Sequence, residues 1–289
     1  MKKFLEEAPL VHAVIHLEFS KNPALSAMTQ EISNSLHQRM IEEGFPERID
    51  SQQEVVEFVF SGHNQPPKQK ITNVHRTLFR ASGEMDVVQV SDHALIIKTT
   101  DYQCFEKFHK KFVSALQACI DVVPNFDKVL LKSVGLRYVD LIAPKRGSSL
   151  SDYVSSEVLP MSLSMLDTPV KRYGKTFTQA QLNESQVMSV NFEEIPSEQG
   201  RVHKVLPDNL IEADPRGGLR IQGHQWWLEL DCPTYGILDI DHQYSFVGSP
   251  VFDISFLNAT IENLYMYANQ VFWGTITDTA KQAWKIKNA

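Results

Sequence analysis

Cysteine and glycine are scarce in this 289-residue sequence, proline is not in excess, and basic residues are outnumbered by acidic ones. Three cysteines with no Cys-x-x-Cys spacing exclude a disulfide-stapled miniprotein and a zinc ribbon. Thirteen glycines and 14 prolines are too few for a fibrous or disordered chain. The net charge is −7, from 28 Lys and Arg against 35 Asp and Glu. This balance disfavours a general nucleic-acid coat, although it leaves room for a local basic patch.

Long apolar runs are also missing. No run approaches the roughly 18–20 residues of a membrane-spanning helix. The N-terminal segment MKKFLEEAPL lacks the apolar core of a signal peptide. These features predict a cytoplasmic protein with no membrane partner, in which Cys104, Cys119 and Cys232 are reduced, buried thiols.

Hydrophobic residues make up 43% of the chain, which suits one large domain or two smaller ones. Apolar alternation in the first half predicts strands at 10–19, 54–60, 74–82, 85–90, 93–99 and 129–142. Apolar spacings of three and four predict helices at 24–43 and 102–123, the second capped by Asp101. This order resembles an elaborated ferredoxin-like sandwich, with two helices covering one face of an antiparallel sheet.

The second half reads as strands followed by a covering helix. We predict strands at 184–195, 201–205, 225–231 and 236–246, a hairpin at 209–223, and helices at 252–271 and 278–287, the last capped by Thr277. The predicted fold is therefore α+β, with two antiparallel or mixed sheets, each covered by helices. Its parts are an N-terminal half (1–145), a connection (146–175) and a β-rich C-terminal half (176–289).

Four segments, in this order, resemble the blocks of a known family: APLVHAVIHLEF, LIIKTTDYQCFEKFHKKF, SVGLRYVDLI and LDIDHQYSF. The family is a sporadically distributed bacterial one of unknown function. Its members carry a PLVE-like strand, a helix start with Thr-Thr, Tyr and Phe, a GLRY-Asn/Asp strand and a late Asp-Ile-Asp strand. They have Glu where this chain has His12, and the resemblance covers about residues 10–273. It implies a bacterial cytoplasmic protein of the kind found in mobile or defence-associated loci, and it supplies no reaction.

Asp239 and Asp241 form the sharpest polar cluster. Because side chains alternate along a strand, both carboxylates project from the same face, and His242 points the other way. Two carboxylates at this spacing can hold a divalent cation, given a further ligand from elsewhere. The alternative is a solvated face, or pairing with basic residues of a neighbouring strand.

Arg137 is the second candidate, since it lies in a strand rich in apolar residues. It shares a face with Gly135, whose missing side chain leaves room for a partner or ligand. Arg137 then either contacts an anion or forms an internal ion pair that holds the two halves together. We expect the ion pair, with Asp239 or Asp241 as the carboxylate.

Four further residues are candidates for an interface. His12 and His16 share a strand face but are roughly 13 Å apart, too far for one metal ion, and are expected at solvent or at an interface. Trp226 and Trp227 place one indole on each face of a predicted strand, so that one packs in the core and the other is free for a partner.

Two classes of function remain. The first is a non-enzymatic binding or assembly protein, without a cofactor, that meets a protein partner or a second copy as a subunit or regulator in a mobile, defence or toxin–antitoxin type locus. The second is a metal-dependent phosphodiesterase or nuclease that uses Asp239 and Asp241 with a divalent metal. We favour the first class because the sequence has no GxSxG, HExxH, SxxK or Cys-His signature.

Overall fold

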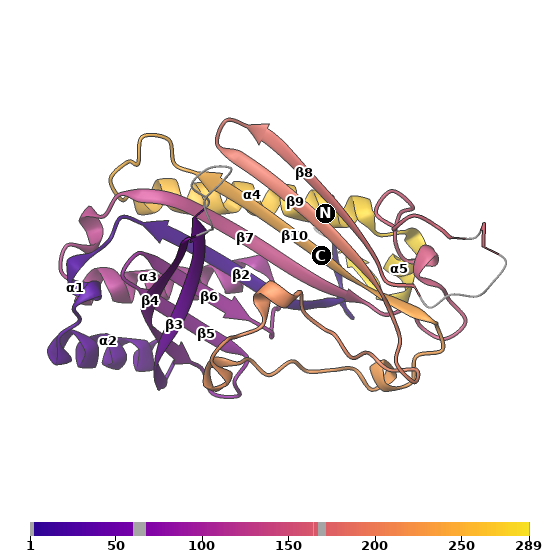
Figure 1. The fold of residues 1–289 in the computed structure, drawn as a ribbon, viewed down its shortest axis with the longest axis horizontal. Helices are drawn as coiled ribbons and strands as arrows, with labels where there is room; N and C mark the ends of the chain where they lie inside the picture. The colour runs from indigo at the N-terminus through magenta and orange to yellow at the C-terminus, as the bar shows by residue number, and fades with distance from the viewer. Residues whose placement is uncertain (1–2, 60–67, 164, 167–171, 289) are drawn as a thin grey trace.

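A nine-stranded antiparallel sheet organises the computed structural model, which describes residues 3–59, 68–163, 165–166 and 172–288 (Figure 1). Its strands, in spatial order, are β3 (Glu47–Val59), β4 (Lys68–Arg80), β5 (Asp86–Ser91), β6 (Ala94–Thr99), β2 (Leu10–Phe19), β7 (Leu131–Ile142), β10 (Thr234–Ser245), β9 (Gln186–Pro196) and β8 (Gly174–Asn183). Two short strands, β1 (Lys3–Leu5) and β11 (Ile286–Asn288), pair separately. The predicted α+β class is confirmed.

The strands of both predicted halves lie in this one sheet, and not in one sheet each. The junction is β7, which pairs with β2 on one side and with β10 on the other, from Gly236 opposite Ile142 to Ser245 opposite Ser133. Alternation within a strand shows which side chains are buried, but it does not show which distant strand will pair with the backbone hydrogen-bonding groups along its edge. The junction between the halves was therefore not predictable from the pattern.

Helices cover one face of the sheet. They are α1 (Pro23–Ser26), α2 (Gln30–Glu42), α3 (Phe105–Val122), α4 (Ile254–Thr275) and α5 (Asp278–Ala283). The main core lies between this layer and the strands, and it contains the predicted stripes of α3 and α4, with Phe112 and Leu264 fully buried. None of the described helices is long and apolar enough to cross a membrane.

Two predicted helix starts are wrong. The helix expected at 24–43 is split, because Asn22 caps α1 and Thr29 caps α2 with side-chain oxygens. The helix expected from 102 begins at Phe105, with Cys104 and not Asp101 at its N-cap. Tyr102 packs its ring edge-on against Phe108, which holds the preceding residues outside the helix.

The opposite face of the sheet is crossed by a segment without regular strands, residues 197–233, here called the covering segment. Figure 1 shows it in orange in front of the strands, with α4 in yellow behind them. The predicted strands at 201–205 and 225–231 and the hairpin at 209–223 are replaced by three short 3₁₀ turns at Asp208–Leu210, Pro215–Gly217 and Gln225–Leu228. Trp227 and Leu230 of this segment pack on Val139 and Ile237 of the sheet.

The edge strand β8 (Gly174–Asn183) falls across the predicted boundary of the connection and was missed. Most of its residues are exposed, so neither face imposes the apolar alternation by which buried strands are found.

Candidate functional site

A polar hollow of about 400 Å³ lies on the sheet face that carries the covering segment. Its floor comes from three adjacent central strands, with His16 and Glu18 on β2, Gly135 and Arg137 on β7, and Asp241 and Gln243 on β10. Its wall comes from Arg76 on β4, Gln89 on β5, Lys98 on β6 and residues 209–213 of the covering segment. The hollow thus joins residues from both predicted halves, including Arg137 and Asp241.

Arg137 contacts Asp239 through two hydrogen bonds. Its Nε donates to Oδ1 and a terminal nitrogen donates to Oδ2, both at 2.7 Å, while Asn209 of the covering segment accepts a further bond at 3.0 Å. Burial opposes the charge of the guanidinium, but Asp239 outweighs it and the pKa of Arg137 rises. The expected ion pair is formed with Asp239, and it joins β7 to β10.

Asp241 is opposite Arg137 in the strand register, yet it accepts its side-chain hydrogen bond from Gln243, at 2.9 Å. In the part of the chain that the structure describes, no cation lies within ion-pair distance of its carboxylate. Burial raises the pKa of Asp241, partly offset by Gln243 and Arg137. Asp241 is therefore the aspartate of the predicted pair that faces the hollow without a cationic partner.

Gly135 opens the floor of the hollow. It lies between His16 on one side and Gln243 on the other, each its direct cross-strand neighbour. A Cβ placed on Gly135 would lie 3.5 Å from Gln243 Cγ and 3.9 Å from Asp241 Oδ1, which are ordinary contacts. A larger side chain at this position would therefore project into the space.

The hollow holds a second carboxylate, Glu18. Ser133 donates a hydrogen bond of 2.8 Å to it, and His16 Nε2 is 3.6 Å away. Burial lowers the pKa of His16, while Glu18 and Asp241 act in the opposite direction. Because the net shift is downward, the imidazole is mostly neutral at neutral pH and does not balance the charge of Glu18.

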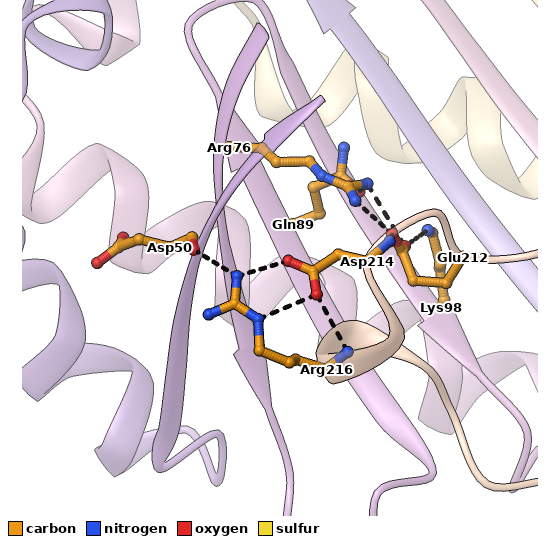
Figure 2. A network of polar contacts seen from close by, with 7 residues as sticks. All are labelled: Asp50, Arg76, Gln89, Lys98, Glu212, Asp214 and Arg216. Atoms are coloured by element: carbon orange, nitrogen blue, oxygen red, sulfur yellow. Dashed lines mark hydrogen bonds and ion pairs between the residues drawn. The ribbon is translucent and has the colours of Figure 1, made fainter. Parts of the chain in front are cut away.

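A network of ion pairs anchors the covering segment over the other end of the hollow (Figure 2). Glu212 receives hydrogen bonds from Arg76 and, at 3.2 Å, from Lys98. Burial raises the pKa of Glu212, but Lys98 and Arg76 outweigh it and the net shift is downward. Glu212 is thus held as an anion between two cations of the sheet.

The 3₁₀ turn at Pro215–Gly217 anchors the covering segment to β3 in a similar way. Arg216 clamps Asp214 with bonds of 3.0 and 2.7 Å, and also donates to the backbone oxygen of Asp50 at 3.1 Å (Figure 2). The Arg216 guanidinium lowers the pKa of Asp214. These contacts fix the wall of the hollow to the sheet.

The other candidates have separate positions. His12 is buried under the covering segment, away from the expected solvent or interface position, and burial lowers its pKa to about 4. The covering segment buries it, since Leu206, Leu210 and Ile211 lie beside His12, and the alternation of β2 does not predict that segment. Trp227 is the buried indole, in the second apolar cluster. The side chain of Trp226 lies outside the described residues.

Sequence reasoning missed Arg76, Lys98 and Glu212. None of the three belongs to a motif or to a periodic spacing of charged residues in the sequence. Lys98 and Glu212 are 114 residues apart and meet because the covering segment folds back over β6. Among the residues that the structure describes, no group of three or more His, Cys, Asp or Glu is placed to hold a metal ion.

A scan against models of known protein families and a search of the curated proteins both find no match to this chain.

Proposed function

We propose that this protein is a non-enzymatic binding protein, and that the polar hollow receives a basic side chain of a protein partner. The observation that carries the proposal is the charge of the hollow. Glu18 and Asp241 face it, His16 beside Glu18 is mostly neutral, and Arg137, which also acts on Asp241, is paired with Asp239. A guanidinium or ammonium group would supply the charge that both carboxylates lack.

The cations already in the hollow support this choice, because each has an acidic partner. Arg137 is paired with Asp239, and Arg76 and Lys98 share Glu212. A ligand that entered as an anion would compete with these carboxylates, whereas a cation would meet Glu18 and Asp241. The anchored wall and floor need little rearrangement, which reduces the ordering cost of binding.

The metal-dependent alternative has weak support at Asp239. Both oxygens of that carboxylate accept hydrogen bonds from Arg137, and a divalent ion would have to displace a guanidinium from them. Asp241 alone is a poor site, because such ions take several oxygen ligands.

We further propose a cytoplasmic, bacterial setting, in a mobile, defence or toxin–antitoxin type locus. The support is the resemblance of four sequence blocks to the sporadically distributed family. Two of these blocks, SVGLRYVDLI and LDIDHQYSF, are the strands β7 and β10 that supply the Arg137–Asp239 pair. A subunit or regulator of such a locus would use the hollow to recognise its partner.

We also infer a ferredoxin-like unit in the first half. The adjacent strands β7, β2, β6 and β5 are the fourth, first, third and second of that unit, with α2 after the first and α3 after the third. The hairpin of β3 and β4 is then an insertion at the sheet edge.

The test uses two small probes of a basic side chain, N-acetylarginine amide and its uncharged counterpart N-acetylcitrulline amide. Each is titrated into the full chain while backbone amide resonances are followed by NMR. We expect the arginine probe to shift the signals of His16, Gly135 and Gln243, and the citrulline probe to leave them unchanged.

Two variants remove the response in different ways. Asp241→Asn removes charge from the hollow, and Gly135→Val fills it without changing charge. Glu184→Gln, on an exposed turn, is the matched control and should respond as wild type. Equal shifts from both probes, or shifts that survive Asp241→Asn, would contradict the proposal.

The same variants then serve as bait in the native host. A partner that contacts the hollow should be recovered with wild type and Glu184→Gln, and lost with Asp241→Asn and Gly135→Val.

A further inference from the structure

The helix-covered face of the sheet holds a second, larger pocket of about 650 Å³, here called the aromatic pocket. It lies between β7, the start of α3, the C-terminal half of α4 and the N-terminal residues 4–8. Seven aromatic side chains line it: Phe4, Tyr102, Phe105, Tyr138, Tyr265, Phe272 and Trp273. Phe105 and Tyr265 are stacked, with ring centroids 4.1 Å apart, and the hydroxyls of Tyr102 and Tyr138 are 3.2 Å apart.

Asp140 of β7 contributes a carboxyl group to this pocket. The residue is only 3% exposed, and its cross-strand neighbours, Leu10 and Leu238, are apolar. Within the described residues its side chain has no hydrogen bond or ion pair. A buried carboxyl without a partner is costly and is absent from most protein interiors. Its position at the wall of a cavity suggests that a ligand supplies the partner.

The other charged groups of the pocket are acidic. Glu6, Glu7 and Glu106 lie along its rim, and no Lys or Arg lines it in the described part of the chain. Glu7 is balanced from outside by Lys145 and Lys285, which lower its pKa to about 2, and Glu6 is 3.9 Å from Lys287. Asp140 differs from these rim residues because it is buried and has no cation paired with it in the described residues.

The remaining titratable groups around Asp140 include no Lys or Arg among the described residues. Tyr102 and Tyr138 have their pKa values raised by burial and stay neutral. The other titratable residues of the lining are Tyr265, Cys104 and His224. Asp239 lies nearby, on the other face of the sheet. Burial, with a smaller contribution from Asp239, raises the pKa of Asp140 to about 8, so the carboxyl group is mostly protonated at pH 7 unless a cation pairs with it.

We infer that the aromatic pocket binds a small organic cation, an ammonium group carried on an apolar or aromatic body, with Asp140 as its counter-ion. Aromatic faces attract cations, and the attraction is strongest when water is excluded. The carboxyl group loses its proton when the cation enters, and that proton goes to solvent. This pocket is on the opposite side of the sheet from the polar hollow, so the inference does not rest on the proposed function.

The experiment compares three probes of similar size on the full chain by isothermal titration calorimetry: phenethylammonium, 2-phenylethanol and 3-phenylpropanoate. We expect phenethylammonium to bind about tenfold more tightly than the neutral alcohol. The anion should bind more weakly than both. Tighter binding of 3-phenylpropanoate would instead indicate an anion site at the start of α3 and would overturn the inference.

Proton release gives a second readout. Titration in buffers of different ionisation enthalpy at pH 7 should show a proton released with phenethylammonium and none with the alcohol. The apparent affinity for the ammonium should rise by up to about tenfold per pH unit from pH 6 to pH 8, because only the ionised carboxylate pairs with it. A flat affinity over this range would contradict the role of Asp140.

Asp140→Asn is the decisive variant, since it keeps the shape and removes the charge. It should retain binding of the alcohol, which shows that the pocket is intact, and lose the proton release and the part of the preference for the ammonium that exceeds cation–π attraction. Glu184→Gln, the same loss of a carboxylate on the exposed turn between β8 and β9, should keep both. If wild type binds none of the probes, or if Asp140→Asn still releases a proton, the inference is wrong.

Discussion

The Arg137–Asp239 pair permits a sharp test of how the two parts of the sheet are joined. The Arg137 side chain is 15% exposed and that of Asp239 is 4% exposed, so either group alone would be a buried, unpaired charge. Removing one member of such a pair costs about 3–5 kcal/mol. Asp239→Asn keeps one acceptor for the guanidinium, so we expect about 3 kcal/mol.

Arg137→Met should behave differently with pH. A guanidinium does not lose its charge in proteins, but a carboxylate left alone takes up a proton. This protonation limits the destabilisation to about 4 kcal/mol at pH 7 and to about 1.5 kcal/mol at pH 5. Both figures follow from about 1.36 kcal/mol for each pH unit above the ordinary carboxyl pKa near 4. The destabilisation by Arg137→Met should therefore shrink on acidification, while that by Asp239→Asn at pH 5 should stay close to its value at pH 7.

Urea unfolding followed by tryptophan fluorescence, at pH 7 and pH 5, measures both effects. The double variant should be more stable than Asp239→Asn alone, because it leaves no buried charge, and the coupling energy should reach about 2 kcal/mol. Single substitutions that each cost under about 0.5 kcal/mol and add independently would show that the pair is solvated and would refute this reasoning.

Four further outcomes follow from the core, the hollow, the thiols and the aromatic pocket. Phe112→Ala should cost about 3–5 kcal/mol in urea unfolding, and Phe177→Ala on the exposed edge strand under about 1 kcal/mol; equal costs would contradict the assigned core. Mn²⁺ or Mg²⁺ should leave the melting temperature unchanged, whereas a site at a hundredfold excess over Kd would add about 2.7 kcal/mol, and a shift abolished by Asp241→Asn would restore the metal alternative. Mass spectrometry should find three free thiols, with Cys119 unreactive until unfolding because burial raises its pKa to about 12; an intramolecular disulfide would overturn this. The Asp140 pKa of about 8 lies above its unfolded value, so the native state holds an extra proton and this group lowers stability as pH rises from about 4 to 8; Asp140→Asn should remove that fall, and a steeper fall would contradict it.

The helices were predictable from the sequence because their apolar stripes face a single partner. The spacing of Phe108, Phe112 and Leu116 identifies the buried side of α3, and all three are buried. Local side-chain capping was less predictable. A carboxylate at 101 is a good cap in isolation, yet Tyr102 packs into the core and delays the helix to Phe105.

The site was predictable only in part. Arg137 and Asp239 were recognisable as charges in apolar strands, which the chain must neutralise. The hollow itself depends on the covering segment, whose course is set by contacts such as Glu212 with Lys98 and Arg216 with the backbone of Asp50. Because these contacts join residues more than 100 positions apart, no local sequence pattern predicts them.

The pairing of β7 with β10 also affects how the chain folds during synthesis. β2, β5, β6 and β7 can associate once residue 142 has left the ribosome, but the second partner of β7 is made about 100 residues later. Until β10 is made, one edge of β7 has no strand paired with it, and Arg137 lacks its partner carboxylate, Asp239. Such distant pairings slow folding and leave strand edges open to other chains. The residues between β7 and β10 therefore set the time during which a nascent chain is most vulnerable to aggregation.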